Sequence, residues 1–311
     1  MIDIKLLEQL CLCNGISGDE GNVRNLIINE IKDCADDIKT DNLGNLIVFK
    51  KGKKSAKSKL MVSAHMDEVG LMVTDITSDG YLKFDEVGGI DRRVLPGKRV
   101  CVGRNGLNGV IGVKPIHLTN GDEKTAVPKM NDMYIDIGAE SREDALKYVN
   151  YGDGINFEGD FKINSKTVVT KALDDRFGCY VLINLIKSEP EYDMYFTFVV
   201  QEEVGLRGAR PAAFTVNPDF ALVIESTTAA DVAEVDASHQ VCNLSKGATV
   251  TVMDRATVYD KEMISAAFEL AEKNNISVQY KRAVAGGNDS GAIHQSRGGV
   301  RTLAVSLPSR Y

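Results

Sequence analysis

Residues 196–209, FTFVVQEEVGLRGA, join a short apolar run to two adjacent glutamates and a glycine. The run at 196–200 contains the β-branched and aromatic residues that are typical of a buried strand. Glu202 and Glu203 follow at the point where that strand would end. A buried carboxylate is costly unless it binds a partner or a metal ion, so this strand end is a candidate site. A solvated strand end is the simpler explanation, and it suits one glutamate better than two.

Helical and strand-like patterns alternate around this stretch. Helical patterns occupy FGCYVLINLIK (177–187), DKEMISAAFELAEKN (260–274) and DSGAIHQS (289–296). Strand-like runs occupy YFTFVV (195–200), FALVIES (220–226), ISVQYK (276–281) and VRTLAVSL (300–307). Such alternation predicts an α/β fold with a mostly parallel sheet and helices on both faces.

The N-terminal part of the chain continues this pattern. Ser17 and Glu20 have the spacing of a capping box, and apolar residues at helical spacing follow as far as Ile31. The runs NLIVFK (45–50) and KLMVSAH (59–65) resemble strands. We expect the lysine-rich segment between these two runs to be a solvated hairpin loop.

The character of the chain changes between residues 69 and 165. Glycine and valine are frequent there, and the strand-like runs are short, as in GVIGVKPIH (109–117), DMYIDIG (132–138) and GINFEG (154–159). We therefore expect a β-rich domain at 69–165, inserted into an α/β domain that comprises residues 1–68 and 166–311.

The composition excludes several classes of protein. The chain has 311 residues, of which 43% are hydrophobic, so it can bury a large core. Its net charge of −7 argues against binding to nucleic acid or to a membrane surface, since both favour a basic face. The start of the chain does not resemble a signal peptide, and no run approaches the roughly 18 apolar residues of a membrane span. The six cysteines lack C-x-x-C spacing, so we expect reduced thiols in a cytoplasmic protein.

Polar groups also follow two other predicted strands. His65 and Asp67 end the run that begins at 59, and side chains two positions apart on an extended chain point the same way. A carboxylate near a histidine can hold one ring N–H while the other nitrogen binds a metal ion. Glu225 ends the run at 220–226. The alternatives are a hydrogen-bonded surface histidine and a carboxylate that caps a turn.

Asp174 and Asp175 stand just before the apolar helix at 177–187. Aspartate is favoured at a helix N-terminus, so capping is the simpler explanation for this pair. A carboxylate in this place could also bridge two cations.

Ligands of open α/β sheets gather at the carboxyl ends of the strands, where all these groups are expected to meet. One histidine with several carboxylates suits Zn²⁺, Co²⁺ or Mn²⁺ in a hydrolytic centre better than a structural zinc site, which favours cysteine. Two ions bridged by a carboxylate would activate a water and hold a tetrahedral intermediate. One glutamate that binds no metal would serve as the general base.

The order of the motifs resembles the glutamyl and tetrahedral (deblocking) aminopeptidase family of dinuclear metallopeptidases, some of which have been labelled endoglucanase or cellulase M. The resemblance covers nearly the whole chain. It rests on NGISGDE, AHMDEVG, VGGIDRRVLPGKRV, GVIGVKPIH, ALDDRFG, QEEVGLRGA, GGNDSGAIH and SLPSRY.

The resemblance implies a phosphorylase/hydrolase-like α/β catalytic domain with an inserted β-barrel-like (PDZ-like) domain that mediates dimers. Members of the family often assemble into tetrahedral dodecamers and remove N-terminal residues from short peptides. It also implies two divalent ions per subunit, zinc or cobalt, with manganese as a further option.

The roles that the resemblance implies are specific. His65 and Glu225 bind one metal ion, with Asp67 steering the histidine. Asp174 bridges the two ions, Glu203 binds the second ion, and Glu202 is the general base.

The resemblance also leaves alternatives open. Family members usually carry a further histidine ligand a few residues after the RY motif, and the sequence printed here stops at Tyr311. Either a longer chain supplies that ligand, or the protein is a catalytically silent assembly protein. An endoglucanase is a third hypothesis, although adjacent glutamates fit a metal centre better than a glycosidase pair.

The segment IESTTAAD (224–231) resembles the glutamyl-type members and suggests a preference for acidic N-terminal residues. Arg255 and Lys261 are candidates for the cation that such a preference needs. An ordinary surface cation is the simpler explanation for each.

Overall fold

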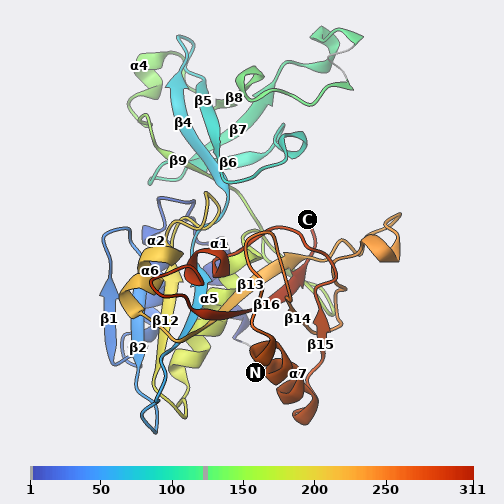
Figure 1. The fold of residues 1–311 in the computed structure, drawn as a ribbon. Coiled ribbons are helices and arrows are strands. Elements are labelled where there is room, and N and C mark those ends of the chain that lie inside the picture. The colour runs from blue at the N-terminus through green and yellow to red at the C-terminus, as the bar shows by residue number, and fades with distance from the viewer. Residues whose placement is uncertain (1–2, 122–124) are drawn as a thin grey trace.

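The computed structural model describes residues 3–121 and 125–311. It has two parts, which lie one above the other in Figure 1. The lower part is built on an eight-stranded sheet. In spatial order its strands are β1 (Asp37–Thr40), β2 (Leu46–Lys50), β12 (Met194–Val199), β3 (Leu60–His65), β13 (Phe220–Thr228), β16 (Arg301–Ser309), β14 (Ala248–Val250) and β15 (Val278–Tyr280).

The centre of this sheet is parallel. Strands β12, β3, β13 and β16 run in one direction, so their carboxyl ends meet at the same edge. Antiparallel pairings join β1 to β2, β2 to β12 and β14 to β16. The predicted mixed, mostly parallel α/β fold is therefore confirmed. The predicted hairpin after β2 is wrong, because β12 lies between β2 and β3 and the lysine-rich segment crosses over it.

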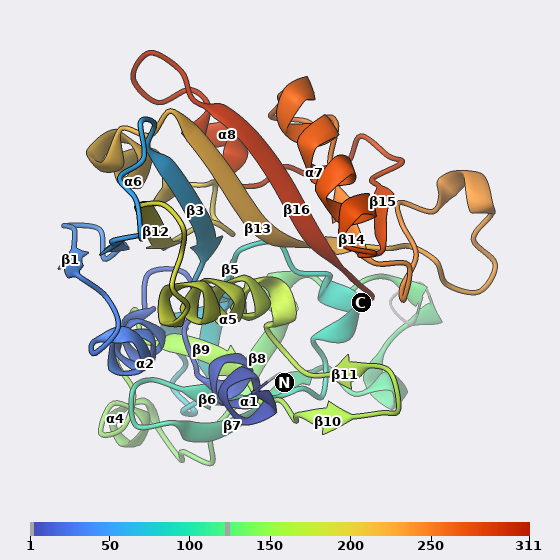
Figure 2. The same cartoon turned by 90° about the horizontal axis from the view of Figure 1, so that it is seen from below.

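Helices cover both faces of the sheet, as Figure 2 shows from below. One face packs against α1 (Ile4–Leu12), α2 (Gly21–Ile31) and α5 (Leu173–Lys187). The other packs against α6 (Ala209–Val216), α7 (Lys261–Lys273) and α8 (Ser290–Ile293). No helix in the described ranges is long and apolar enough to cross a membrane.

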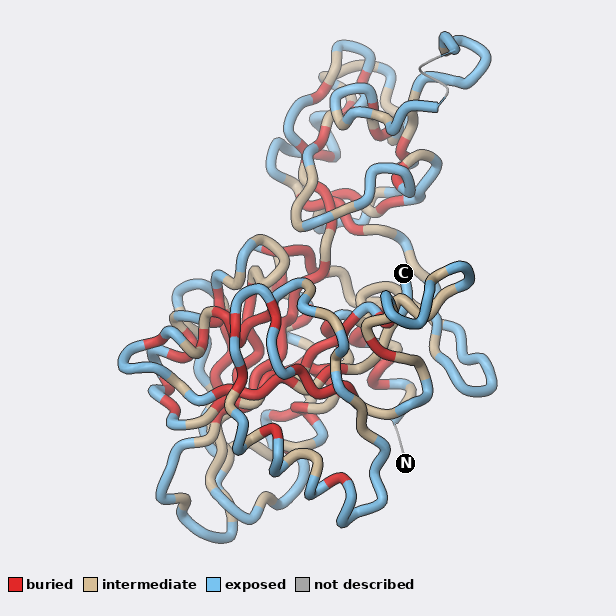
Figure 3. Tube along the Cα trace, turned by 45° about the vertical axis from the view of Figure 1, so that its right-hand side comes forward, coloured by how far each residue is buried: buried red, intermediate tan, exposed pale blue. Residues whose placement is uncertain are grey.

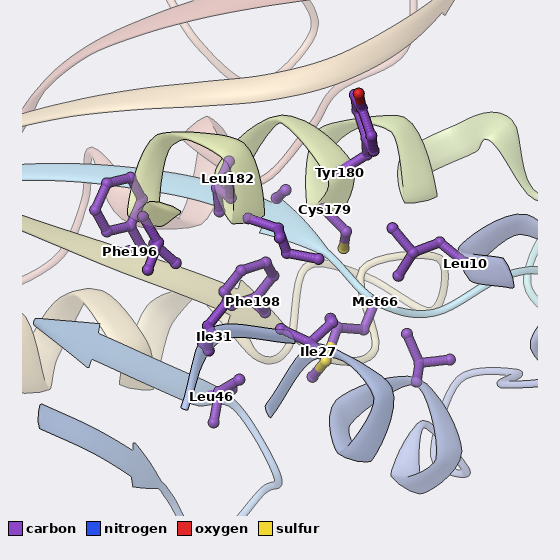
Figure 4. Close-up of a cluster of buried hydrophobic side chains, with 14 of the residues drawn as sticks. Leu10, Ile27, Ile31, Leu46, Met66, Cys179, Tyr180, Leu182, Phe196 and Phe198 are labelled. Carbon is purple, nitrogen blue, oxygen red and sulfur yellow. The ribbon is translucent and has the colours of Figure 1, made fainter. Parts of the chain in front are cut away.

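The apolar run at 196–200 forms the middle of the core. Phe196 and Phe198 of β12 are fully buried among side chains from α2 and α5, including Ile27, Ile31 and Leu182 (Figure 4). Figure 3 shows the buried positions concentrated along the central strands of the lower part. The strand ends that carry the candidate residues therefore rest on a rigid, well-packed base.

The upper part is a closed six-stranded barrel. Its strands, in spatial order, are β4 (Gly70–Ile76), β5 (Leu82–Val87), β8 (Met133–Asp136), β7 (Leu107–Val113), β6 (Arg99–Val102) and β9 (Gly154–Phe157). A short helix, α4 (Arg142–Ala145), adjoins it, and a small hairpin of β10 (Lys162–Ile163) and β11 (Val168–Val169) leads back to α5. Closure leaves the barrel without free strand edges, and a separate apolar core fills it.

Candidate metal centre

The candidate residues lie together at the carboxyl edge of the sheet. His65 is the last residue of β3 and pairs in register with Val199 at the end of β12. Glu202 and Glu203 lie in the turn that follows β12, and Glu225 lies in the second half of β13. The parallel pairing of these strands therefore brings three separate sequence motifs to one place, as the strand-end rule predicts.

His65 is oriented by one neighbour and faces two others. Its side chain is buried, and Nδ1 lies 3.0 Å from the backbone oxygen of Asp67. Its Nε2 lies 3.3 Å from Asp174 Oδ1 and 3.5 Å from Glu225 Oε1. Because Nδ1–H donates to the carbonyl, a neutral ring points the lone pair of Nε2 at two carboxylates. A cation between them relieves that repulsion.

Two groups of potential ligand atoms share this histidine. His65, Asp174 and Glu225 form one group, and the ligand atoms of its members all lie within 4.8 Å of one another. His65, Glu202 and Glu203 form the second, on the same criterion. The structure thus brings together every residue that the sequence analysis named as a metal ligand or general base.

Without a bound cation, negative charges on the clustered glutamates of the centre are unfavourable. Burial is the main reason why the pKa of Glu202 lies at about 10, and the charges of Glu225 and Asp289 add to it. Burial likewise raises the pKa of Glu203 to about 7 and that of Glu225 to about 8. It opposes a charge on His65, but the surrounding carboxylates outweigh it and raise the pKa of the ring well above its usual value.

The donor set fits divalent cations. One imidazole and several carboxylates match the ligand preference of zinc, cobalt and manganese in hydrolytic centres. Glu225 Oε2 is buried and has no hydrogen-bond partner among the described residues. A buried carboxylate oxygen without a donor is costly, and coordination to a cation is a way to satisfy it.

The two aspartates at the start of α5 have different roles. Asp175 Oδ1 accepts the backbone N–H of Gly178 at 2.9 Å, which is the contact of an N-cap. Both aspartates have non-helical backbone angles, and the peptide bond between them is cis. The side chain of Asp174 remains 52% exposed and reaches His65. The capping explanation therefore holds for Asp175, while Asp174 faces the centre.

The turn that carries the two glutamates is held at both ends. Asn45 Oδ1 accepts the N–H of Val200 at 3.0 Å, and its Nδ2 donates to the oxygen of Gly208 at 2.9 Å. Glu20 Oε1 accepts the N–H of Gln201 at 3.2 Å. These contacts fix the backbone on which Glu202 and Glu203 stand, so their side chains are presented by a rigid turn.

The sequence analysis missed two charged groups near the centre. Asp289 is 1% exposed, and neither of its carboxylate oxygens has a hydrogen-bond partner in the part of the chain that the structure describes. Lys281 is half-buried, and its Nζ donates to the oxygen of Ala285 at 2.9 Å. Burial lowers the pKa of Lys281, against the opposing effect of Asp254 and Glu225. Asp289 belongs to the GGNDSGAIH motif, to which the sequence assigns no role, whereas Lys281 stands in no recognisable pattern. Only the fold brings both residues here.

The two cations named from sequence are both exposed. Lys261 is the first residue of α7, and Arg255 lies in the loop before that helix. The backbone N–H of Arg255 donates to the oxygen of Gly286 at 3.0 Å, which places this loop beside the segment that leads to Asp289.

Comparison with protein families gives one match that spans most of the chain. The model of the M42 glutamyl aminopeptidase family matches residues 44–311. A putative aminopeptidase of Acetivibrio thermocellus is 44% identical over 308 residues, which cover 98% of this chain and 90% of that protein. The lysyl aminopeptidase of Pyrococcus furiosus is 33% identical and is matched over 100% of this chain and 90% of its own length.

The chain is also similar to solved structures of peptidases. The TET aminopeptidase of a marine sediment archaeon, Thaumarchaeota archaeon SCGC AB-539-E09, superposes with a TM-score of 0.94 at 33% identity, covering 99% of this chain and 88% of that one. The Pyrococcus horikoshii TET1 peptidase, described as assembling into a tetrahedron or a large octahedral shell, superposes with a TM-score of 0.87 at 40% identity. That match covers 99% of this chain and 91% of the other.

Replacing Glu225 tests whether the centre binds metal ions. We expect Glu225→Gln to weaken zinc binding at least about 10-fold, because it removes the charge that faces His65 Nε2. Competition with a chromophoric chelator measures the affinity. Glu269→Gln on α7 is the matched control, and an equal loss in both variants would contradict the assignment.

Proposed function

Because this chain belongs to the M42 glutamyl aminopeptidase family, we propose that it is a metal-dependent aminopeptidase that releases N-terminal residues from short peptides. The observation that carries the proposal is the shared position of His65 between two groups of carboxylates whose ligand atoms lie within 4.8 Å. A buried imidazole that faces several carboxylates is an arrangement typical of hydrolytic metal centres.

The proposed ligand assignment is the one that the family resemblance implies, and the proximity of His65, Asp174 and Glu225 supports it for one ion. His65 and Glu225 would hold one ion, Glu203 the second, and Asp174 would lie between them. When bound, such ions supply Lewis-acid chemistry, which polarises a carbonyl and makes water a nucleophile near neutral pH. We propose zinc or cobalt as the ions, with manganese as a further option.

Glu202 is the proposed general base. It would take a proton from the attacking water and deliver it to the amine that leaves when the peptide bond breaks. Its backbone N–H donates to Asp67 Oδ1 at 3.0 Å, while that of Glu203 donates to Asp67 Oδ2 at 3.1 Å. The two glutamates stand in the turn after β12, and both offer a carboxylate oxygen close to His65. We propose that Glu203 binds the metal ion and that Glu202 remains free to accept the proton.

Replacing Glu202 tests the mechanism. We expect Glu202→Gln to lower kcat on aminoacyl anilides by about 10²-fold or more, since the amide cannot accept the proton. Glu269→Gln on the exposed face of α7 should keep wild-type activity. Wild-type kcat in Glu202→Gln would rule out this residue as the base. Activity on a cellulose derivative that persists in the presence of a chelator would instead favour a glycosidase.

We further propose a preference for acidic N-terminal residues, with Lys281 as the cation that recognises them. Its ammonium is half-buried, and Glu225 and Asp254 act on its charge. A partly desolvated ammonium is a stronger partner for a substrate carboxylate than the exposed side chains of Arg255 and Lys261.

The substrate preference is tested with anilides of Glu, Asp, Ala and Leu. We expect Lys281→Met to lower kcat/KM for the Glu anilide at least about 10-fold while changing that for the Ala anilide little, because only the acidic side chain loses its partner. Lys273→Met, at the exposed end of α7, is the control. An equal loss on both anilides would contradict the assignment.

The inserted barrel is the proposed dimerisation domain, with boundaries at residues 69 and 165, and self-assembly to dimers and a tetrahedral dodecamer is proposed by analogy with the Pyrococcus horikoshii TET1 peptidase. We expect light scattering of the purified protein to give a mass near twelve subunits. Removing the barrel should abolish any assembly larger than a monomer, and a monomeric full-length protein would contradict the proposal.

A further inference from the structure

Ser17 has no capping role, although the sequence suggests one. Helix α2 begins at Gly21 with Glu20 at its N-cap, and no side chain in the described part of the structure caps it. The Ser17 hydroxyl instead donates to Asp67 Oδ2 at 2.6 Å. Ser17 is 4% exposed and Asp67 is fully buried, so this hydrogen bond is shielded from water.

Asp67 forms hydrogen bonds with three residues of the centre. Its carboxylate accepts the N–H groups of Glu202 and Glu203 at 3.0 and 3.1 Å. Its backbone oxygen lies 3.0 Å from Nδ1 of His65. The orientation of the Asp67 side chain therefore sets where the turn with both glutamates lies relative to the histidine.

The side chain of Asp67 is the acceptor in all of these hydrogen bonds. Its Oδ1 accepts the backbone N–H of Glu202, and its Oδ2 accepts both the backbone N–H of Glu203 and the Ser17 hydroxyl. A backbone N–H can only donate, so the carboxylate is the acceptor and the Ser17 hydroxyl is its third donor.

The backbone around Ser17 is fixed by both parts of the molecule. Gly15 N–H donates to Glu68 Oε1 at 3.3 Å and to Asn156 Oδ1 of β9 at 3.1 Å. Ile16 is fully buried, and a Cβ on Gly70 at the start of β4 would lie 2.2 Å from its Cγ2. Residues 15–17 are thus clamped between the barrel and the end of β3, which leaves the hydroxyl little freedom.

We propose that Ser17 is a positioning residue of this centre, which acts through Asp67 on the turn that carries Glu202 and Glu203. Its effect on catalysis rests on the proposed aminopeptidase function, whereas its effect on the turn does not. The hydrogen bond that the Ser17 side chain makes goes to Asp67 and not to a proposed metal ligand. A displacement of a catalytic group by about 1 Å is enough to lower a rate strongly, so loss of this hydroxyl should be visible in kcat.

The test compares Ser17→Ala with Ser63→Ala. Ser63 is also a fully buried serine, and it accepts a hydrogen bond from Thr197 Oγ1 at 2.9 Å, away from Asp67. We expect Ser17→Ala to lower kcat about 10- to 100-fold with KM changed less than about twofold. We expect Ser63→Ala to keep kcat even if both variants melt earlier than the wild type.

Hydrogen exchange on the metal-free protein gives a readout that is independent of activity. We expect the amides of Glu202 and Glu203 to exchange about 10-fold faster in Ser17→Ala, and at the wild-type rate in Ser63→Ala. If Ser17→Ala does not fold, Ser17→Thr replaces it; because this variant keeps the hydroxyl, it should retain the protection of both amides.

The outcomes separate the two proposals. Wild-type kcat and amide exchange in Ser17→Ala would overturn the positioning role, as would an equal change in Ser63→Ala or loss of protection in folded Ser17→Thr. If the wild-type protein cleaves no aminoacyl anilide after metal loading, the proposed function fails. In that event faster exchange confined to Ser17→Ala would still support the role of Ser17 in holding the turn.

Discussion

The arrangement of the lower part depends on the hydrogen bonds of one buried group, the guanidinium of Arg176. It has no exposed surface, and it donates to the backbone oxygens of Leu10, Cys13 and Met66 at 2.6–2.8 Å. It also contacts Glu68 at 3.4 Å, as a charged partner. One side chain thereby joins the end of α1, the segment after β3 and the start of α5. A buried charge is tolerated only with such full pairing, so these three segments must come together for the fold to be stable.

Much of the fold and of the candidate site could be predicted because the relevant signals are local. Apolar runs that lead to His65, Glu202 and Glu225 mark the carboxyl-terminal parts of three strands, and parallel pairing brings these parts to one edge of the sheet. The change to short strands after Val69 is also a local signal, and it indicates the barrel. The structure adds the register, which brings the ligand atoms within reach of one another.

The rest could not be predicted because it depends on contacts between distant parts of the chain. The sequence predicts a hairpin where the lysine-rich segment crosses over β12, since no local pattern indicates that β12 inserts between β2 and β3. The spacing of Ser17 and Glu20 favours a capping box, but a buried carboxylate fifty positions away is a stronger partner for the hydroxyl than a solvated helix end. The sequence does not indicate a role for Lys281, because its place near the site depends on how the loop that ends at Asp289 folds.

The pairing of the first and last strands of the barrel has a consequence for the order of folding. Leu71 of β4 pairs with Ile155 of β9, so the chain enters and leaves the barrel at neighbouring positions. Once the barrel has closed, the lower part no longer has to bring together two ends of a long flexible segment, and the loop-closure entropy of the whole insertion has already been lost. The barrel then behaves as a short linker between β3 and α5. This predicts that the sheet below is completed faster once the barrel has formed.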